Sequence, residues 1–253
     1  MNRIAIIVLA AAAAGAAWGQ DGHSIMVEVQ KRQHSDSMRY EGTLYSCTSS
    51  KGCPPNSKAL VTKRWVYERI GDFGKSKGIL RFTGPAEVKG VALLIVNHPD
   101  AASDQWVWRP AVGREQKVAI QDRDTRFFGT DFTFEDLEER DADQYTYTVD
   151  GQMNGWWKID AKPKKASQYT HLYFYIDKTN YTFQRIEGFT KKGLAKTIDY
   201  ADYEMIKGIW TARSVEVIDT LRNTRTALHY DKVDYNLPLK DEAFTVEALR
   251  IPE

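Results

Sequence analysis

Side chains that could do chemistry are scattered along this 253-residue chain. Its histidines lack the His-x-x-x-His and His-Glu-x-x-His spacings that bind zinc on a helix; they are His23, His34, His98, His171 and His229. The sequence contains no Gly-x-Ser-x-Gly elbow and no glycine-rich phosphate loop. The letters Asp-Phe-Gly at 72–74 lie in a turn between two predicted strands, without other kinase motifs. We therefore predict no catalytic residue, no metal site and no cofactor, and a protein that is not an enzyme.

The two cysteines, Cys47 and Cys53, could also be reactive. In an exported protein such a pair usually forms a disulfide, and closing this short loop would stabilise the fold by roughly 2 kcal/mol. The alternative is a redox or metal pair, but the spacing is not Cys-x-x-Cys and no histidine cluster accompanies it. We predict a structural disulfide.

The first 19 residues resemble a secretory signal. Arg3 is followed by the apolar run 4–17 and by Ala17-Trp18-Gly19, a small-x-small cleavage site. A membrane anchor is the alternative, but it needs ~20 apolar residues, and this run is shorter and is followed by Gln20 and Asp21. We expect an exported, soluble protein whose residues 20–253 form one domain.

Charge gives no indication of a nucleic-acid or membrane partner. Without the signal, which contains Arg3 alone, 34 basic and 34 acidic side chains remain. A chain near neutrality has no general attraction for nucleic acid or an anionic membrane. The acidic run 138–141 is interpreted as a solvated turn.

Aromatic residues give the strongest signal. Four phenylalanines lie within residues 127–134, broken by Gly129 and Asp131, so that neither a strand nor a helix period fits. Asp131 could cap a short helix that begins near Phe132, with acids in its first turns. A loop this apolar must cover something apolar. It could be a plug of the core, or the rim or lid of a cavity.

The rest of the chain indicates strands. They are predicted at 38–45, 60–70, 77–82, 91–97, 105–109, 144–153, 155–160, 171–176, 182–189, 197–206, 211–219 and 224–235, punctuated by Gly, Pro, Asn or Asp. Helical segments are predicted at 24–33, 132–139 and 239–244. Many strands with short connections favour an antiparallel meander that curls.

Several aromatic pairs could line a cavity in such a sheet. Trp106 and Trp108 are two residues apart and share one face of a strand, as do Tyr173 and Tyr175. For each residue ordinary core packing is the alternative. We expect an apolar chamber touched by Trp106 or Trp108. The candidate ligand-binding set is Trp106, Trp108, Phe127, Phe128, Phe132, Phe134, Leu137, Tyr145 and Tyr147, and Gly129, Asp131 and Asp136 are expected to hold the loop.

The string Arg126-Phe-Phe-Gly-Thr-Asp-Phe-Thr-Phe-Glu-Asp-Leu137 resembles the F-x-G-S-D-F-T-Y-E-D-L block of an outer-membrane lipoprotein-sorting family. That family lies within the superfamily of the periplasmic lipoprotein carrier LolA. Segments 105–111, 143–147, 80–85 with 88–90, and 241–245 are also similar, so the resemblance covers most of the mature chain. Thr130 and Phe134 replace the usual serine and tyrosine, and the two-cysteine loop is not part of the pattern.

The resemblance implies a mainly β fold with a single strongly curved antiparallel sheet, an open half-barrel similar to LolA and LolB. A few short helices would cover its concave face, an apolar cavity for acyl chains. It implies a monomeric periplasmic carrier of a lipid, lipoprotein or other long apolar ligand, acting in lipoprotein sorting or transporter-linked lipid trafficking. An inner-membrane transporter and an outer-membrane acceptor would be its partners.

Three functions other than a carrier are alternatives. The first is a non-carrier accessory subunit of an envelope export complex, whose sheet its own side chains fill. A hydrolase would need clustered nucleophile and base groups. A membrane barrel is disfavoured because Lys and Arg occur on both alternation phases.

Overall fold

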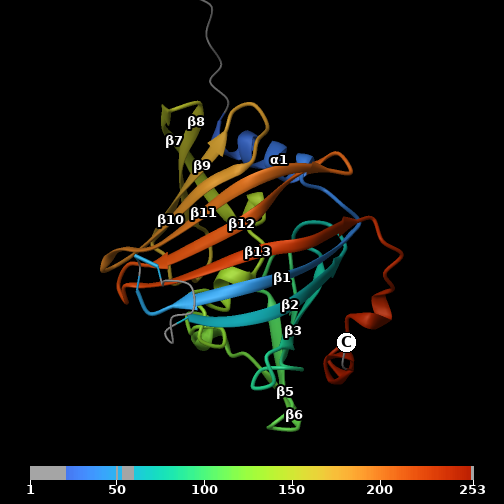
Figure 1. Ribbon diagram of the computed structural model, residues 1–253. Coiled ribbons are helices and arrows are strands. Elements are labelled where there is room, and N and C mark those ends of the chain that lie inside the picture. The colour runs from blue at the N-terminus through green and yellow to red at the C-terminus, as the bar shows by residue number, and fades with distance from the viewer. Residues whose placement is uncertain (1–20, 50, 53–59, 252–253) are drawn as a thin grey trace, which may run out of the picture.

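The computed structural model describes residues 21–49, 51–52 and 60–251. Their thirteen strands form one antiparallel sheet, which is curved (Figure 1) and has the order β6-β5-β4-β3-β2-β1-β13-β12-β11-β10-β9-β8-β7. All neighbours in the sheet are also neighbours in sequence, except β1 and β13. The two edge strands, β6 and β7, are consecutive in the chain, so the segment between them must cross from one edge of the sheet to the other.

The strands of the first half are β1 (Ser37–Cys47), β2 (Leu60–Ile70), β3 (Lys77–Gly84), β4 (Ala92–Val96), β5 (Asp104–Arg109) and β6 (Arg114–Lys117). Those of the second half are β7 (Tyr145–Met153), β8 (Trp156–Pro163), β9 (His171–Asp177), β10 (Phe183–Thr190), β11 (Gly193–Ile206), β12 (Ile209–Asp219) and β13 (Thr224–Tyr235). The α-helix α1 spans Gly22–Arg32, and short 3-10 helices span Ile120–Asp122, Glu135–Leu137, Ala142–Gln144, Asp241–Ala243 and Glu247–Arg250.

Two-residue turns join several of these strands. Asn154 and Gly155 between β7 and β8, and Lys207 and Gly208 between β11 and β12, all have positive φ. Two positive-φ residues in succession suit the twist of a tight hairpin.

Helix α1 closes one end of the sheet's inner face. Asp21 caps it by accepting a 2.9 Å hydrogen bond from the backbone N–H of Ser24. Ile25, Met26 and Val29 are almost fully buried against inward residues of β8 to β12. No helix among the described residues is long and apolar enough to cross a membrane.

The inner face carries two connected apolar clusters and the outer face carries another. One inner cluster joins α1 to β8–β12, and the second is built on β1–β5. On the outer face, the C-terminal segment buries Phe244 and Leu249 against β3–β5; Figure 1 shows this segment beside the sheet.

The predicted fold class is confirmed: the protein is mainly β, with one curved antiparallel sheet that is not closed. All twelve predicted strands are present, with ends shifted by a few residues, and β6 was not predicted. The predicted helix at 24–33 corresponds to α1. The predicted helical turn at 132–139 is a 3-10 helix restricted to Glu135–Leu137. The predicted secretion signal at 1–19 lies outside the described residues.

Candidate functional site

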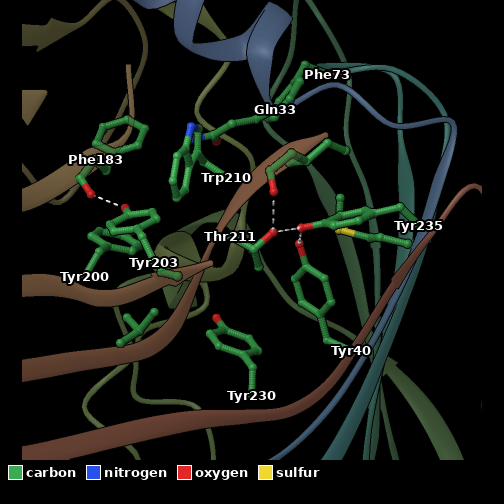
Figure 2. A pocket seen from close by; sticks show the side chains of 14 residues that line it. Gln33, Tyr40, Phe73, Phe183, Tyr200, Tyr203, Trp210, Thr211, Tyr230 and Tyr235 are labelled. Atoms are coloured by element: carbon green, nitrogen blue, oxygen red, sulfur yellow. Dashed lines mark hydrogen bonds between the residues drawn. The ribbon is translucent and has the colours of Figure 1, made fainter. Parts of the chain in front are cut away.

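A two-lobed pocket lies between α1 and the inner face of β10–β13, and Figure 2 shows the first lobe. The first lobe has a volume of about 150 Å³ and the second about 180 Å³. Both are lined by Gln33, Phe73, Phe183 and Tyr200, which makes them adjacent. The first lobe adds Met38, Tyr40, Tyr203, Ile209, Trp210, Thr211, Ala212, Val215, Tyr230 and Tyr235, none of them charged.

One wall of the first lobe is a hydrogen-bonded row of hydroxyls. The Tyr40 and Tyr235 hydroxyls lie 2.9 Å apart, and the Tyr235 hydroxyl lies 2.7 Å from that of Thr211 (Figure 2). Because these three hydroxyls form hydrogen bonds with one another, they do not require a hydrogen bond from a ligand.

Two other tyrosines keep their hydroxyls available. No hydrogen bond to the Tyr200 or Tyr230 hydroxyl is formed by any residue that the structure describes, and both side chains line the first lobe. Burial raises the pKa of both phenols, so they remain neutral. Each can donate or accept one hydrogen bond from a ligand. An apolar pocket with a few convergent polar groups is typical of a small-molecule site.

The phenylalanine-rich segment fills the inner face beside this pocket. It folds as a small hairpin, in which the Phe127 N–H donates to the Phe132 carbonyl at 2.8 Å and Arg126 pairs with Thr133. Phe128 and Gly129 have positive φ at its tip, so Gly129 occupies a position that suits glycine.

Its side chains join the two inner clusters. Phe127 and Phe134 are buried against β1–β5, where Phe127 stacks on Phe82 at a ring distance of 5.5 Å. Phe132 belongs to the cluster of α1, and Leu137 contacts both clusters. Phe128 is half-buried, with the Arg109 guanidinium 5.3 Å from its ring centre. These contacts are those of a plug.

Asp131 does not cap a helix, contrary to the sequence interpretation. Its buried carboxylate accepts hydrogen bonds from Arg126 at 2.7 Å and from the hydroxyls of Thr224 and Thr226 on β13. Since no helix starts at Phe132, the carboxylate is free to tie the hairpin to the sheet.

Asp136 forms a second set of buried contacts. It accepts hydrogen bonds from the Thr133 N–H at 2.9 Å and from the Tyr169 hydroxyl at 2.7 Å, and it pairs with Lys196 on β11. Burial alone would raise the pKa of this carboxyl, but the charges of Lys196 and Arg140 hold it below its usual value. Asp131 and Asp136 thus anchor the hairpin to two different strands.

The other predicted ligand-binding residues lie elsewhere. Trp106 and Trp108 are on the outer face, packed with the C-terminal segment. Trp108 lines a separate groove of about 310 Å³ there. Tyr145 and Tyr147 are inward residues of the edge strand β7, packed on the cluster of α1. Of the residues the structure describes, none from the predicted ligand set lines the two-lobed pocket. The predicted set stays a prediction.

The structure also bears on the interpretations of the acidic run and of the cysteine pair. The run 138–141 is not a solvated turn, because Glu138 and Glu139 are mostly buried and pair with Arg123 and Arg69. Cys47 is a buried residue at the end of β1, but Cys53 lies outside the described residues, so the disulfide stays a prediction.

No group of three or more His, Cys, Asp or Glu side chains in the described ranges could hold a metal ion.

Sequence reasoning missed most of the pocket. Phe73 lies in the turn whose Asp-Phe-Gly letters indicated nothing, yet it lines both lobes. Tyr200 and Tyr230 lie on strands that were predicted without singling out these residues. The only available signal was the high tyrosine count, 13 in the whole chain.

Solved structures share this architecture. A putative outer membrane lipoprotein-sorting protein domain from Vibrio parahaemolyticus is 23% identical, with a TM-score of 0.82 over 91% of this chain and 98% of that one. A DUF1329 family protein from Desulfovibrio piger is 22% identical, with a TM-score of 0.82 over 90% and 97%. A LolA superfamily protein from Nitrosomonas europaea is 18% identical, with a TM-score of 0.70 over 90% and 98%. The chain therefore has the fold of the LolA superfamily.

A comparison with protein-family models assigns the chain to a family. A family model described as "-like: Uncharacterized protein" matches residues 74–251, and the chain belongs to that family. This description states no activity. No curated protein matches the chain in sequence.

Proposed function

We propose that the protein is a periplasmic carrier that binds an apolar ligand, such as an acyl chain of a lipid or lipoprotein, and makes or breaks no bond. The observation that carries this proposal is the two-lobed pocket on the inner face of a LolA-like sheet. Its lining is mostly apolar and aromatic, with the charged Arg140 in the second lobe, and Tyr200 and Tyr230 offer free hydroxyls. The solved structure named for lipoprotein sorting, which shares the fold, supports the same interpretation.

The size of the pocket limits the ligand. The two lobes, about 150 and 180 Å³, together reach the lower end of the ~300–1,000 Å³ that ligand pockets occupy. A 150 Å³ apolar cavity holds one benzene, so two such lobes accommodate roughly twelve carbons. Each methylene removed from water contributes about 0.8 kcal/mol. Apolar burial therefore suffices to drive binding.

The biological setting follows from the predicted signal at 1–19 and from the fold. An exported carrier of this class would collect its ligand from an inner-membrane transporter and deliver it to an outer-membrane acceptor. It would act as a monomer, without a cofactor or nucleic acid. Residues 20–253 would form its single domain.

Native mass spectrometry of residues 20–253, purified from the periplasm of a Gram-negative host, tests the proposal. We expect a stoichiometric mass increment that organic solvent extracts as lipid. Ala212 lines the first lobe, so Ala212→Trp should abolish the increment. Ala201→Trp is the matched control, because Ala201 is exposed on the neighbouring strand β11. A wild-type protein that carries no lipid and binds none added would refute the carrier function.

One observation favours a second candidate, a non-carrier accessory subunit of an envelope export complex. The hairpin at 126–137 fills much of the inner face with the protein's own side chains. Such a subunit would copurify with an envelope protein and without lipid, and Ala212→Trp would leave that association unchanged.

A further inference from the structure

The inner end of the pocket contains a buried arginine that lacks close partners. Arg140 follows the phenylalanine hairpin and lines the second lobe. Its side chain is only 15% exposed, and its nearest carboxylate oxygen, on Asp136, is 3.5 Å away. None of the residues in the described ranges forms a hydrogen bond to its guanidinium. A guanidinium has five N–H donors, so Arg140 keeps hydrogen-bonding capacity toward the pocket that it lines.

Asp136 does not neutralise this arginine by itself. Lys196 is the closer cation of Asp136, and Tyr169 and Thr133 occupy the remaining positions around the carboxylate. Two cations thus share one buried carboxylate. The positive charge left over belongs to Arg140, the group that faces the pocket.

Two tyrosines extend the polar end of the pocket. Tyr200 lines both lobes, and Tyr145 lines a small polar recess of about 50 Å³ on the other side of Arg140. No hydrogen bond to either hydroxyl is formed within the described part of the chain. Burial raises the pKa of both phenols, that of Tyr145 to about 12, so both keep the proton that they can donate.

The recess also contains acidic groups, but other residues engage them. Glu138 pairs with Arg123, and Glu139 pairs with Arg69. Glu135 accepts hydrogen bonds from Ser167 and from the Gln168 N–H. Among the residues that line the two lobes, Arg140 is the charged one.

We infer that the ligand is a long-chain carboxylate, whose hydrocarbon lies in the two lobes and whose carboxylate binds Arg140 with Tyr200 and Tyr145. This inference rests on the proposed carrier function and specifies its ligand class. The small recess favours a carboxylate over the bulkier phosphate of a lipid head group. An arginine fork also matches the two oxygens of a carboxylate.

Head-group comparison by isothermal titration calorimetry tests this without any mutation. Delipidated residues 20–253 are titrated with laurate, dodecan-1-ol and dodecyl phosphate, which share a twelve-carbon chain. Charge-assisted hydrogen bonds should make laurate bind about ten- to a hundredfold more tightly than the alcohol. Equal affinity for laurate and the alcohol overturns the inference but leaves apolar binding intact. Tighter binding of the phosphate overturns the choice of carboxylate. If none of the three binds, the proposed carrier function fails as well.

Variants then assign the contact. Arg140→Gln should remove the preference for laurate over dodecan-1-ol and leave alcohol binding within a fewfold of wild type. Arg185→Gln is the control, since Arg185 pairs with Asp199 on the outer face and should leave the preference unchanged. If Arg140→Gln does not fold, Tyr200→Phe should reduce the preference severalfold. A preference that survives in a folded Arg140→Gln protein refutes the role of Arg140.

Discussion

Asp131 should contribute to stability as the anchor of the phenylalanine hairpin. Its side chain is fully buried and accepts hydrogen bonds from Arg126 and from the hydroxyls of Thr224 and Thr226. Asp131→Ala leaves both threonine hydroxyls without this acceptor and Arg126 without its carboxylate. We therefore expect the free energy of unfolding to decrease substantially.

The expected magnitude follows from these partners. Removing one member of a buried ion pair costs about 3–5 kcal/mol. Arg126 is 28% exposed and can be partly rehydrated, which places the loss near the lower limit, about 3 kcal/mol. For a chain of this size, each kcal/mol lowers the melting temperature by about 2–4 °C, so we expect a decrease of roughly 6–12 °C.

Urea unfolding followed by tryptophan fluorescence and circular dichroism measures this loss. Asp131→Asn, which keeps the shape and one acceptor, should lose less than Asp131→Ala. Asp150→Ala is the control, because Asp150 pairs with Lys158 at the surface and such pairs contribute at most about 1 kcal/mol. If Asp131→Ala changes the free energy of unfolding by less than Asp150→Ala does, the hairpin is not held by this carboxylate.

Three further predictions concern stability. Phe134→Ala should cost about 3–5 kcal/mol in urea unfolding because the ring is buried in the cluster built on β1–β5. A loss below 1 kcal/mol would show that the site collapses. Gly42→Ala should cost about 3 kcal/mol or more, because its new methyl would lie 2.1 Å from the His229 carbonyl oxygen. Gly151→Ala is the control, since the methyl there meets no atom within 4 Å and the change should be nearly neutral. Equal urea midpoints for the two variants would contradict this prediction. Asp136 has a lowered pKa, so its stabilisation is present above the unfolded value of about 3.9 and is lost as pH falls through the folded value. Asp136→Asn should therefore flatten the acid limb of a urea-midpoint profile between pH 7 and pH 2, and an unchanged slope would refute that role.

Strands could be predicted from sequence because their side chains record the alternation of the two faces. In β13, apolar Leu228 and Tyr230 alternate with polar His229 and Asp231, and β2 coincides with its predicted range. β6 could not be predicted, since Arg114–Lys117 is four polar residues without β-branched or aromatic side chains. It exists because β5 offers it an edge, which is tertiary information.

The site was less predictable than the fold. The apolar character of residues 126–137 was evident, and the structure places them on the inner face. The pocket, in contrast, is assembled from α1, the turn at Phe73 and strands β10–β13. Which tyrosine hydroxyls remain free depends on neighbours distant in sequence, as with Tyr40 and Tyr235, which pair across 195 positions. Spacing within one strand contains no such information.

The two carboxylate anchors of the hairpin decide which part of the protein could move to admit a larger ligand. Displacing the hairpin would break the contacts of Asp131 with β13 and those of Asp136 with β11, at about 3–5 kcal/mol each. A ligand would need to bury roughly eight to twelve additional methylenes, at about 0.8 kcal/mol each, to compensate. Helix α1 faces the same pocket mainly through apolar contacts of Met26 and Val29, which have no fixed hydrogen-bond geometry. A longer chain should therefore enlarge the pocket on the side of α1, while the hairpin beside the pocket stays in place.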